Sequence, residues 1–130
     1  MSTSEAATTD FDVWLRETFH RLGSFTAFVV LLHIKDTTVS PQCSTYFHVI
    51  GTDIDWAGMT ILLAGSGYDW QGAVFFADEG GGKGPLDNVT ARVKQRALEQ
   101  AIDKDRLHIN RGEFFDPWGR RMRIDEVDGT

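Results

Sequence analysis

Apolar residues recur every three to four positions between residues 10 and 22, which is the spacing of one face of a helix. The residues on this face are Phe11, Trp14, Leu15, Thr18, Phe19 and Leu22. Either Thr9 or Asp10 is placed to cap the start of the helix, and Gly23 to end it. The pattern therefore predicts an N-terminal amphipathic helix that packs one side against a core.

Four later segments have the character of strands. Residues 25–34 are apolar at nearly every position, which predicts a strand covered on both faces. Residues 45–50 alternate, and residues 59–64 and 73–77 are short apolar runs. Their short glycine-bearing connections favour an antiparallel meander, and residues 37–42 are expected to form a loop.

A second helix and a hairpin are predicted after the glycine-rich residues 80–84. Asp87 is placed to cap the helix. The residues expected on its apolar face are Leu86, Val89, Val93, Ala97 and Ala101. The sequence Asp116-Pro117-Trp118-Gly119 is typical of a type I turn, and we expect it to bring Phe114 and Phe115 opposite Met122 and Ile124.

These elements predict an α+β fold. It has a mainly antiparallel sheet of four to five strands, with the N-terminal helix and the second helix packed on one face, and a C-terminal β-hairpin. A more closed, barrel-like sheet with helices at its ends is the alternative. We expect residues 1–9 to be a disordered tail and residues 10–127 to form a single globular domain.

One motif occurs twice, fourteen residues apart: Gly51–Gly58 and Gly65–Gly72 align with their Asp-Trp-x-Gly cores superposed. Asp116–Gly119 is a related tetrad. The candidate binding residues in these turns are Trp56, Trp70, Trp118, Asp55 and Asp69. Such a Trp beside a carboxylate either stacks on a sugar or a cationic group, or folds back over the core while the Asp satisfies turn amides. In a meander Trp56 and Trp70 are expected to lie far apart.

The residues Asp53, Asp55 and Asp69, with His48 upstream, are the cluster that most resembles a metal or acid–base site. The further ligands of a calcium loop are missing, and residues 80–84 lack the hydroxyl of a phosphate-binding loop, so no metal and no cofactor is expected. Cys43 has no nearby basic activator and is expected to be an inert thiol. No nucleophile–base pair is evident, which weighs against an enzyme.

The net charge of −6 is unevenly distributed along the chain. Residues 1–90 hold four basic and eleven acidic groups, whereas residues 91–130 hold nine and eight. The acidic part argues against direct nucleic-acid binding, and it is compatible with a basic protein partner or with nucleic-acid mimicry. Moderate acidity is also the norm for cytosolic proteins. Arg121 and Arg123 alternate on one face of the last strand, either as a solvated face or as a docking patch for an acidic partner or for the chain's own acidic half.

The expected compartment is the cytoplasm. The chain has a single cysteine, its longest apolar run is ten residues, and residues 1–10 lack the pattern of a signal peptide. No membrane segment is therefore expected. The Asp116–Gly119 turn resembles a loop of type II secretion pseudopilins over four residues, and no function is drawn from it.

The sequence thus favours a small acidic non-catalytic binding protein that engages a protein partner, as an inhibitor, immunity factor or adaptor does. One alternative is carbohydrate or small-ligand binding through the Trp turns. The other is a metal-dependent hydrolase that uses Asp53, Asp55, Asp69 and His48. The sequence leaves open whether the protein forms a homo-oligomer.

Overall fold

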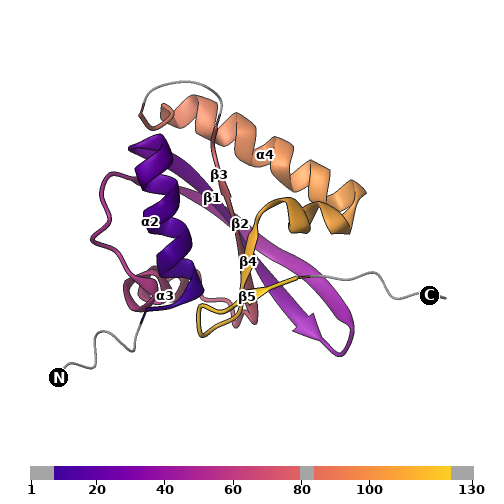
Figure 1. Cartoon of the computed structure of the whole chain (residues 1–130). Coiled ribbons are helices and arrows are strands. Elements are labelled where there is room, and N and C mark those ends of the chain that lie inside the picture. Colours follow the sequence, from indigo (N-terminus) through magenta and orange to yellow (C-terminus); the bar gives the residue numbers. More distant parts are fainter. Residues whose placement is uncertain (1–7, 80–83, 124–130) are drawn as a thin grey trace.

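The computed structural model describes residues 8–79 and 84–123 (Figure 1). Its elements are α2 (Asp10–Leu22), β1 (Phe25–Lys35), β2 (Thr38–Val49), α3 (Trp56–Ala64), β3 (Gly72–Ala77), α4 (Asn88–Lys104), the 3-10 helix η1 (Arg106–Arg111), β4 (Glu113–Phe115) and β5 (Arg121–Met122). The strands form one antiparallel sheet in the order β2-β1-β3-β4-β5. The predicted α+β class and the C-terminal hairpin, β4–β5, are confirmed.

Parts of the predicted chain organisation fall outside the described residues. These are residues 1–7 of the expected tail, residues 80–83 of the glycine-rich joint, and the end of the expected domain, which includes Ile124.

Thr9, one of the two expected caps, begins α2: its hydroxyl accepts from the amide of Asp12 at 3.1 Å, and its own amide donates to the Asp12 carboxylate.

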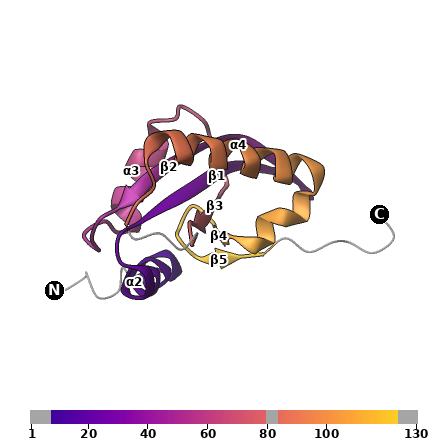
Figure 2. The same cartoon turned by 90° about the horizontal axis from the view of Figure 1, so that it is seen from above.

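The two long helices cover opposite faces of the sheet, α2 on one side and α4 on the other (Figure 2). Ala27, Val29 and Leu31 of β1 pack in one cluster with residues of α2 and α3. Val30 and Leu32 pack in a second cluster with Ile102 and Ile109, from α4 and η1, respectively. The prediction that both helices lie on one face is wrong, because β1 is apolar on both faces and each face needs its own cover.

Residues 59–64, predicted as a strand, belong instead to the helix α3. The carboxylate of Asp55 caps it by accepting from the amide of Gly58 at 2.8 Å. A second carboxylate, that of Asp12, accepts from the amide of Trp56 at 2.8 Å. Two free amides of the first turn are thus satisfied from outside the helix, and the chain is fixed in helical geometry at this point. The predicted strand over residues 73–77 is confirmed as β3.

Residues 38–42 of the expected loop over residues 37–42 instead belong to β2, which pairs with β1 from Lys35 opposite Thr38 onward, and residue 37 lies in the turn before β2. The register shifts between Leu31, which pairs with Cys43, and Leu32, which pairs with Pro41. Gln42 is therefore the extra residue of a β-bulge in β2. Proline is tolerated here because β2 is an edge strand and the bulge already interrupts its ladder.

The helix α4 begins where predicted, but the residues that it buries against the sheet are not the predicted ones. Asp87 caps it by accepting from the amide of Thr90 at 3.3 Å. Ala91 and Ile102 are buried, whereas Val89 and Val93 are 71% and 64% exposed. The helix therefore turns the predicted apolar stripe towards solvent, and a different stripe, at the same helical spacing, faces the sheet.

Candidate functional site

The three Asp-Trp-containing turns come together in space. The rings of Trp56 and Trp70 meet edge to face, with centroids 6.1 Å apart. The indole Nε1 of Trp56 donates to the carbonyl of Pro117 at 2.9 Å. The expectation that Trp56 and Trp70 lie far apart is wrong, because the intervening segment is the helix α3 and not a strand of a meander.

This convergence builds core rather than a ligand platform. The Trp56 side chain is 6% exposed and packs on Phe11, with ring centroids 4.9 Å apart. Trp70 is partly buried against the same cluster. Trp118 is 68% exposed, but the guanidinium of Arg120 lies 5.2 Å from its ring centre and covers one face. The rings therefore do not line up as a stacking surface for a sugar.

The carboxylates of these turns have structural partners. Asp55 caps α3, and Asp116 accepts from the amides of Trp118 and Arg120 at 2.9 and 3.0 Å. This matches the expectation that such an Asp satisfies turn amides. Asp69, the equivalent residue of the second copy, is exposed.

The predicted cluster of His48, Asp53, Asp55 and Asp69 does not assemble into a metal site. Over residues 8–79 and 84–123, no group of three or more His, Cys, Asp or Glu side chains lies close enough to hold a metal ion. The Nδ1 atom of His48 lies 2.9 Å from the hydroxyl oxygen of Thr26, which also accepts from the amide of Leu86 at 2.8 Å. His48 thus helps to hold the segment before α4 against β1.

The basic C-terminal residues meet the chain's own carboxylates. Arg121 forms an ion pair with Glu113 at 3.0 Å, and its amide donates to Asp10 at 2.8 Å. Arg123 lines a hollow of about 520 Å³ together with Arg121 and Glu113. The side chain of Arg121 thus pairs with a carboxylate of the same C-terminal part of the chain, and it is the backbone amide that contacts the acidic part, at Asp10. Docking of Arg121 and Arg123 on an acidic partner or on the chain's own acidic half stays a prediction.

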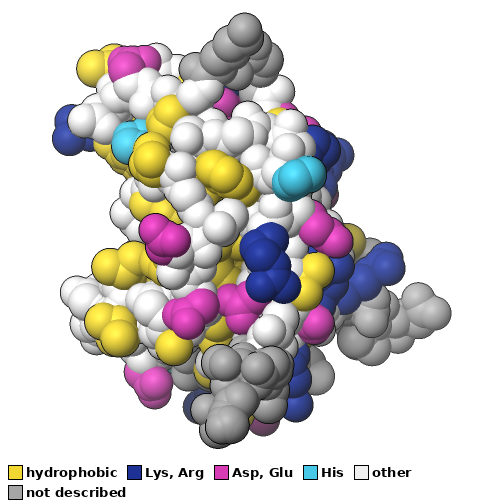
Figure 3. Space-filling model, turned by 60° about the vertical axis from the view of Figure 1, so that its left-hand side comes forward, with side chains coloured by type: hydrophobic (Ala, Val, Ile, Leu, Met, Phe, Trp, Pro, Cys, Tyr) yellow, Lys and Arg dark blue, Asp and Glu magenta, His cyan; other side chains and the backbone are white. Residues whose placement is uncertain are grey.

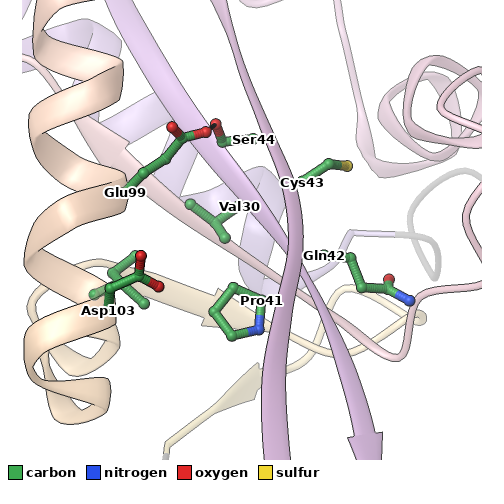
Figure 4. A pocket seen from close by; sticks show the side chains of 8 residues that line it. Val30, Pro41, Gln42, Cys43, Ser44, Glu99 and Asp103 are labelled. Carbon is green, nitrogen blue, oxygen red and sulfur yellow. Dashed lines mark hydrogen bonds between the residues drawn. The ribbon is translucent and has the colours of Figure 1, made fainter.

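A hollow of about 200 Å³ lies between β2 and α4. Figure 4 shows Glu99 of α4 reaching towards Ser44, whose hydroxyl donates to it, while Gln42 and Cys43 point to the other side of β2. Burial raises the pKa of the Cys43 thiol, which disfavours the reactive thiolate. This agrees with the expectation of an inert thiol.

A different surface stands out on α3. The helix has no charged side chain along its whole length, Trp56–Ala64. Its outer positions are therefore apolar: Ile61 is 74% exposed and Leu62 is 59% exposed, and Ile50 beside them is exposed as well. Surface helices normally turn a polar face outward. We name Ile50, Ile61 and Leu62 the α3 surface.

Two hollows flank Leu62. The first, of about 250 Å³, is lined by Phe47, His48, Val49, Ile50, Gly51, Asp53, Ile54 and Leu62. The second, of about 200 Å³, is lined by Val29, Leu31, Cys43, Ser44, Thr45, Leu62, Leu63 and Ser66. Leu62 thus stands as an exposed ridge between two shallow apolar recesses, a shape that a partner's side chains can fill.

The stretch of sequence that contains the α3 surface carries charged side chains of one sign. Between Lys35 and Lys83 the sequence has six Asp and Glu residues and no Lys or Arg. Asp53 lies on the wall of the first hollow. Figure 3 brings forward the side of the molecule on which α2 and α3 lie, and shows hydrophobic side chains interspersed with Asp and Glu and with some Lys and Arg. The carboxylates of the stretch that contains the α3 surface attract cationic groups.

Sequence reasoning missed the α3 surface because it assigned residues 59–64 to a buried strand. The available signal was the absence of any charged residue from Trp56 to Ala64, next to an Asp that can cap a helix. A helix of that composition at the molecular surface must expose apolar side chains.

No protein-family model, curated protein or solved structure matches this chain. Within the part of the chain that the structure describes, no helix is long and apolar enough to cross a bilayer.

Proposed function

We propose that the protein is a small non-catalytic binding protein whose α3 surface docks a basic, apolar segment of a protein partner, in the manner of an inhibitor, immunity factor or adaptor. The observation that carries this proposal is the exposure of Ile61 and Leu62 on a helix with no charged residue, within an acidic stretch of the chain. Contiguous apolar residues with a polar rim are typical of interaction sites.

The chemistry of the recesses supports a partner that combines apolar and cationic groups. The stem of a Lys or Arg side chain fits along Ile50 and Leu62 while its charged head meets Asp53. Leu62, between the two hollows, is the expected anchor, since binding energy concentrates at a few well-packed central residues. The acidic surroundings accelerate encounter with a basic partner.

A non-catalytic role fits the work that the titratable groups already do. Asp55 caps a helix, Asp12 joins α2 to α3, and His48 bonds Thr26. Each of these side chains is held by a structural contact. The pKa of the partly buried Cys43 thiol is raised, which disfavours the thiolate and suits a reducing compartment, and we place the protein in the cytoplasm.

Site-specific photo-crosslinking tests the proposal. A photo-reactive amino acid in place of Ile61 is expected to trap one discrete protein in the native host, through a segment of that protein that combines apolar and cationic side chains. Excess unlabelled wild-type chain should compete for this product, and the Leu62→Asp variant should not. Val13→Asp changes an exposed valine on α2 and serves as the matched control, which should compete like wild type.

Two results would overturn the proposal. One is an Ile61 probe that yields no specific product. The other is competition by Leu62→Asp that equals that of Val13→Asp, since the product would then be independent of the α3 surface.

A further inference from the structure

The outward side of α4 has the complementary composition to the α3 surface. Val89, Arg92, Val93 and Arg96 are all exposed and follow the spacing i, i+3, i+4, i+7. This is the pattern by which a helix lays one face into a groove. We name these four residues the α4 surface. It presents two apolar side chains that alternate with two cations, whereas the α3 surface presents apolar side chains beside the carboxylate of Asp53.

We propose that the partner of the α3 surface is the α4 surface of a second copy of this chain, so that copies associate head to tail. The proposal rests on the proposed function, because it names the basic, apolar element that the α3 surface docks. Val93 then packs on Leu62, and the guanidinium of Arg92 or Arg96 reaches Asp53 across the first hollow.

The α4 surface of one copy cannot cover the α3 surface of the same copy. Met59 and Leu63 anchor α3 in the cluster on one face of the sheet, and Ile102 anchors α4 in the cluster on the other face. The two surfaces therefore belong to opposite sides of the molecule. Each copy offers one of each, which makes the contact heterologous and leads to a closed ring or an open chain.

Charge disfavours the symmetric alternatives. A dimer that pairs two α3 surfaces would bring Asp53 and its acidic neighbourhood together with a copy of itself. A dimer that pairs two α4 surfaces would do the same with Arg92 and Arg96. Like charges that face each other across an interface cost several kcal/mol, so the mixed pairing is the favourable one.

Analytical ultracentrifugation of the purified full-length chain tests this proposal. The wild type is expected to sediment faster as its concentration rises. Leu62→Asp disrupts the α3 surface, and the double variant Arg92→Glu/Arg96→Glu disrupts the α4 surface. Each of these two variants, measured on its own, is expected to stay monomeric. Arg16→Glu/Lys35→Glu changes two exposed cations elsewhere by the same charge and should associate like wild type. Circular dichroism and thermal melting confirm that each variant is folded.

An equimolar mixture of the two monomeric variants gives the decisive result. Each retains the surface that the other lacks, so the mixture should form discrete heterodimers that do not grow further. A wild-type chain that stays monomeric at every concentration would overturn the proposal, as would a mixture that stays monomeric. If self-association fails in this way, an Ile61 probe that traps a protein other than this chain still supports the proposed function. The two failures are therefore distinguishable.

Discussion

The indole Nε1 of Trp56 and the carbonyl oxygen of Pro117 lie 2.9 Å apart and form a hydrogen bond between residues 61 positions apart in the chain. This bond fixes the C-terminal turn over the start of α3. The same ring packs edge to face on Trp70 and at a tilt on Phe11, so that a single side chain joins α2, α3 and two of the turns.

Removal of this side chain is expected to destabilise the fold strongly. Trp56→Ala should lower the free energy of unfolding by ~3–5 kcal/mol, because it leaves a cavity and frees the Pro117 carbonyl. Trp118→Ala should cost little, since that ring is 68% exposed. Urea denaturation followed by circular dichroism measures both. Equal losses for the two variants would show that Trp56 does not brace the core.

The sequence repeat illustrates where prediction stops. Its second copy leads into Val74, Phe75 and Phe76, which favour strands, and β3 was predicted correctly. The first copy leads into Met59, Leu62 and Leu63, which suit either state in so short a run. What decides for a helix is partly the carboxylate of Asp12, forty-four positions away, and local pattern cannot foresee such a contact.

The candidate site was foreseen only in part. Acidity and its compatibility with a basic partner follow from charge counts. The α3 surface did not, because exposure depends on which side of α3 meets the sheet. The same holds for α4, where two apolar stripes compete and tertiary packing selects Ala91 and Ile102 over Val89 and Val93.

The carboxylate of Asp12 is expected to matter more than an ordinary helix cap. Its Oδ1 accepts from the Trp56 amide, and its Oδ2 accepts from both the amide and the hydroxyl of Thr9. Asp12→Ala should cost on the order of 3 kcal/mol, because hydrogen bonds to charged groups are strong and a buried amide loses its partner. Thr9→Ala loses the cap and the hydrogen bond from the Thr9 hydroxyl to Asp12 but keeps the bond between Asp12 and the Trp56 amide, and it should cost about 1 kcal/mol. Guanidinium unfolding measures the loss of unfolding free energy in both variants. Losses of similar size would mean that the hydrogen bond between Asp12 and the Trp56 amide adds nothing beyond the helix cap.

Acid is expected to weaken the start of α4. Hydrogen bonds from the side chain and backbone of Thr90 lower the pKa of Asp87 below its ordinary value of 3.8. A carboxyl whose folded pKa is depressed stabilises the fold above its unfolded pKa, and this contribution disappears as the pH falls through the folded value. Wild type should therefore melt higher than Asp87→Asn near neutral pH, and the difference should vanish well below pH 3.8.

The comparison with Asp87→Asn isolates this group. The pKa of Glu79 is also lowered, by its hydrogen bond and ion pair with Arg21, so wild type and variant share that acid-sensitive contribution. Melting scans across the acid range provide the measurement. A difference in melting temperature that is the same at neutral and acid pH would mean that the charge of Asp87 does not stabilise α4.

Gly119 and Gly67 form a matched pair for testing the contact between the C-terminal turn and α3. Both have φ of +81°, a conformation that costs an L-residue about 1–2 kcal/mol. A Cβ on Gly67 would meet nothing within 4 Å, whereas one on Gly119 would lie 2.9 Å from Thr9 and from the Trp56 ring. Gly67→Ala should therefore show the backbone cost alone. Gly119→Ala should lose a further ~1–3 kcal/mol, because the turn must move off Trp56. Chemical denaturation of the two variants compares them directly, and losses of equal size would mean that the turn is not held against Trp56 in solution.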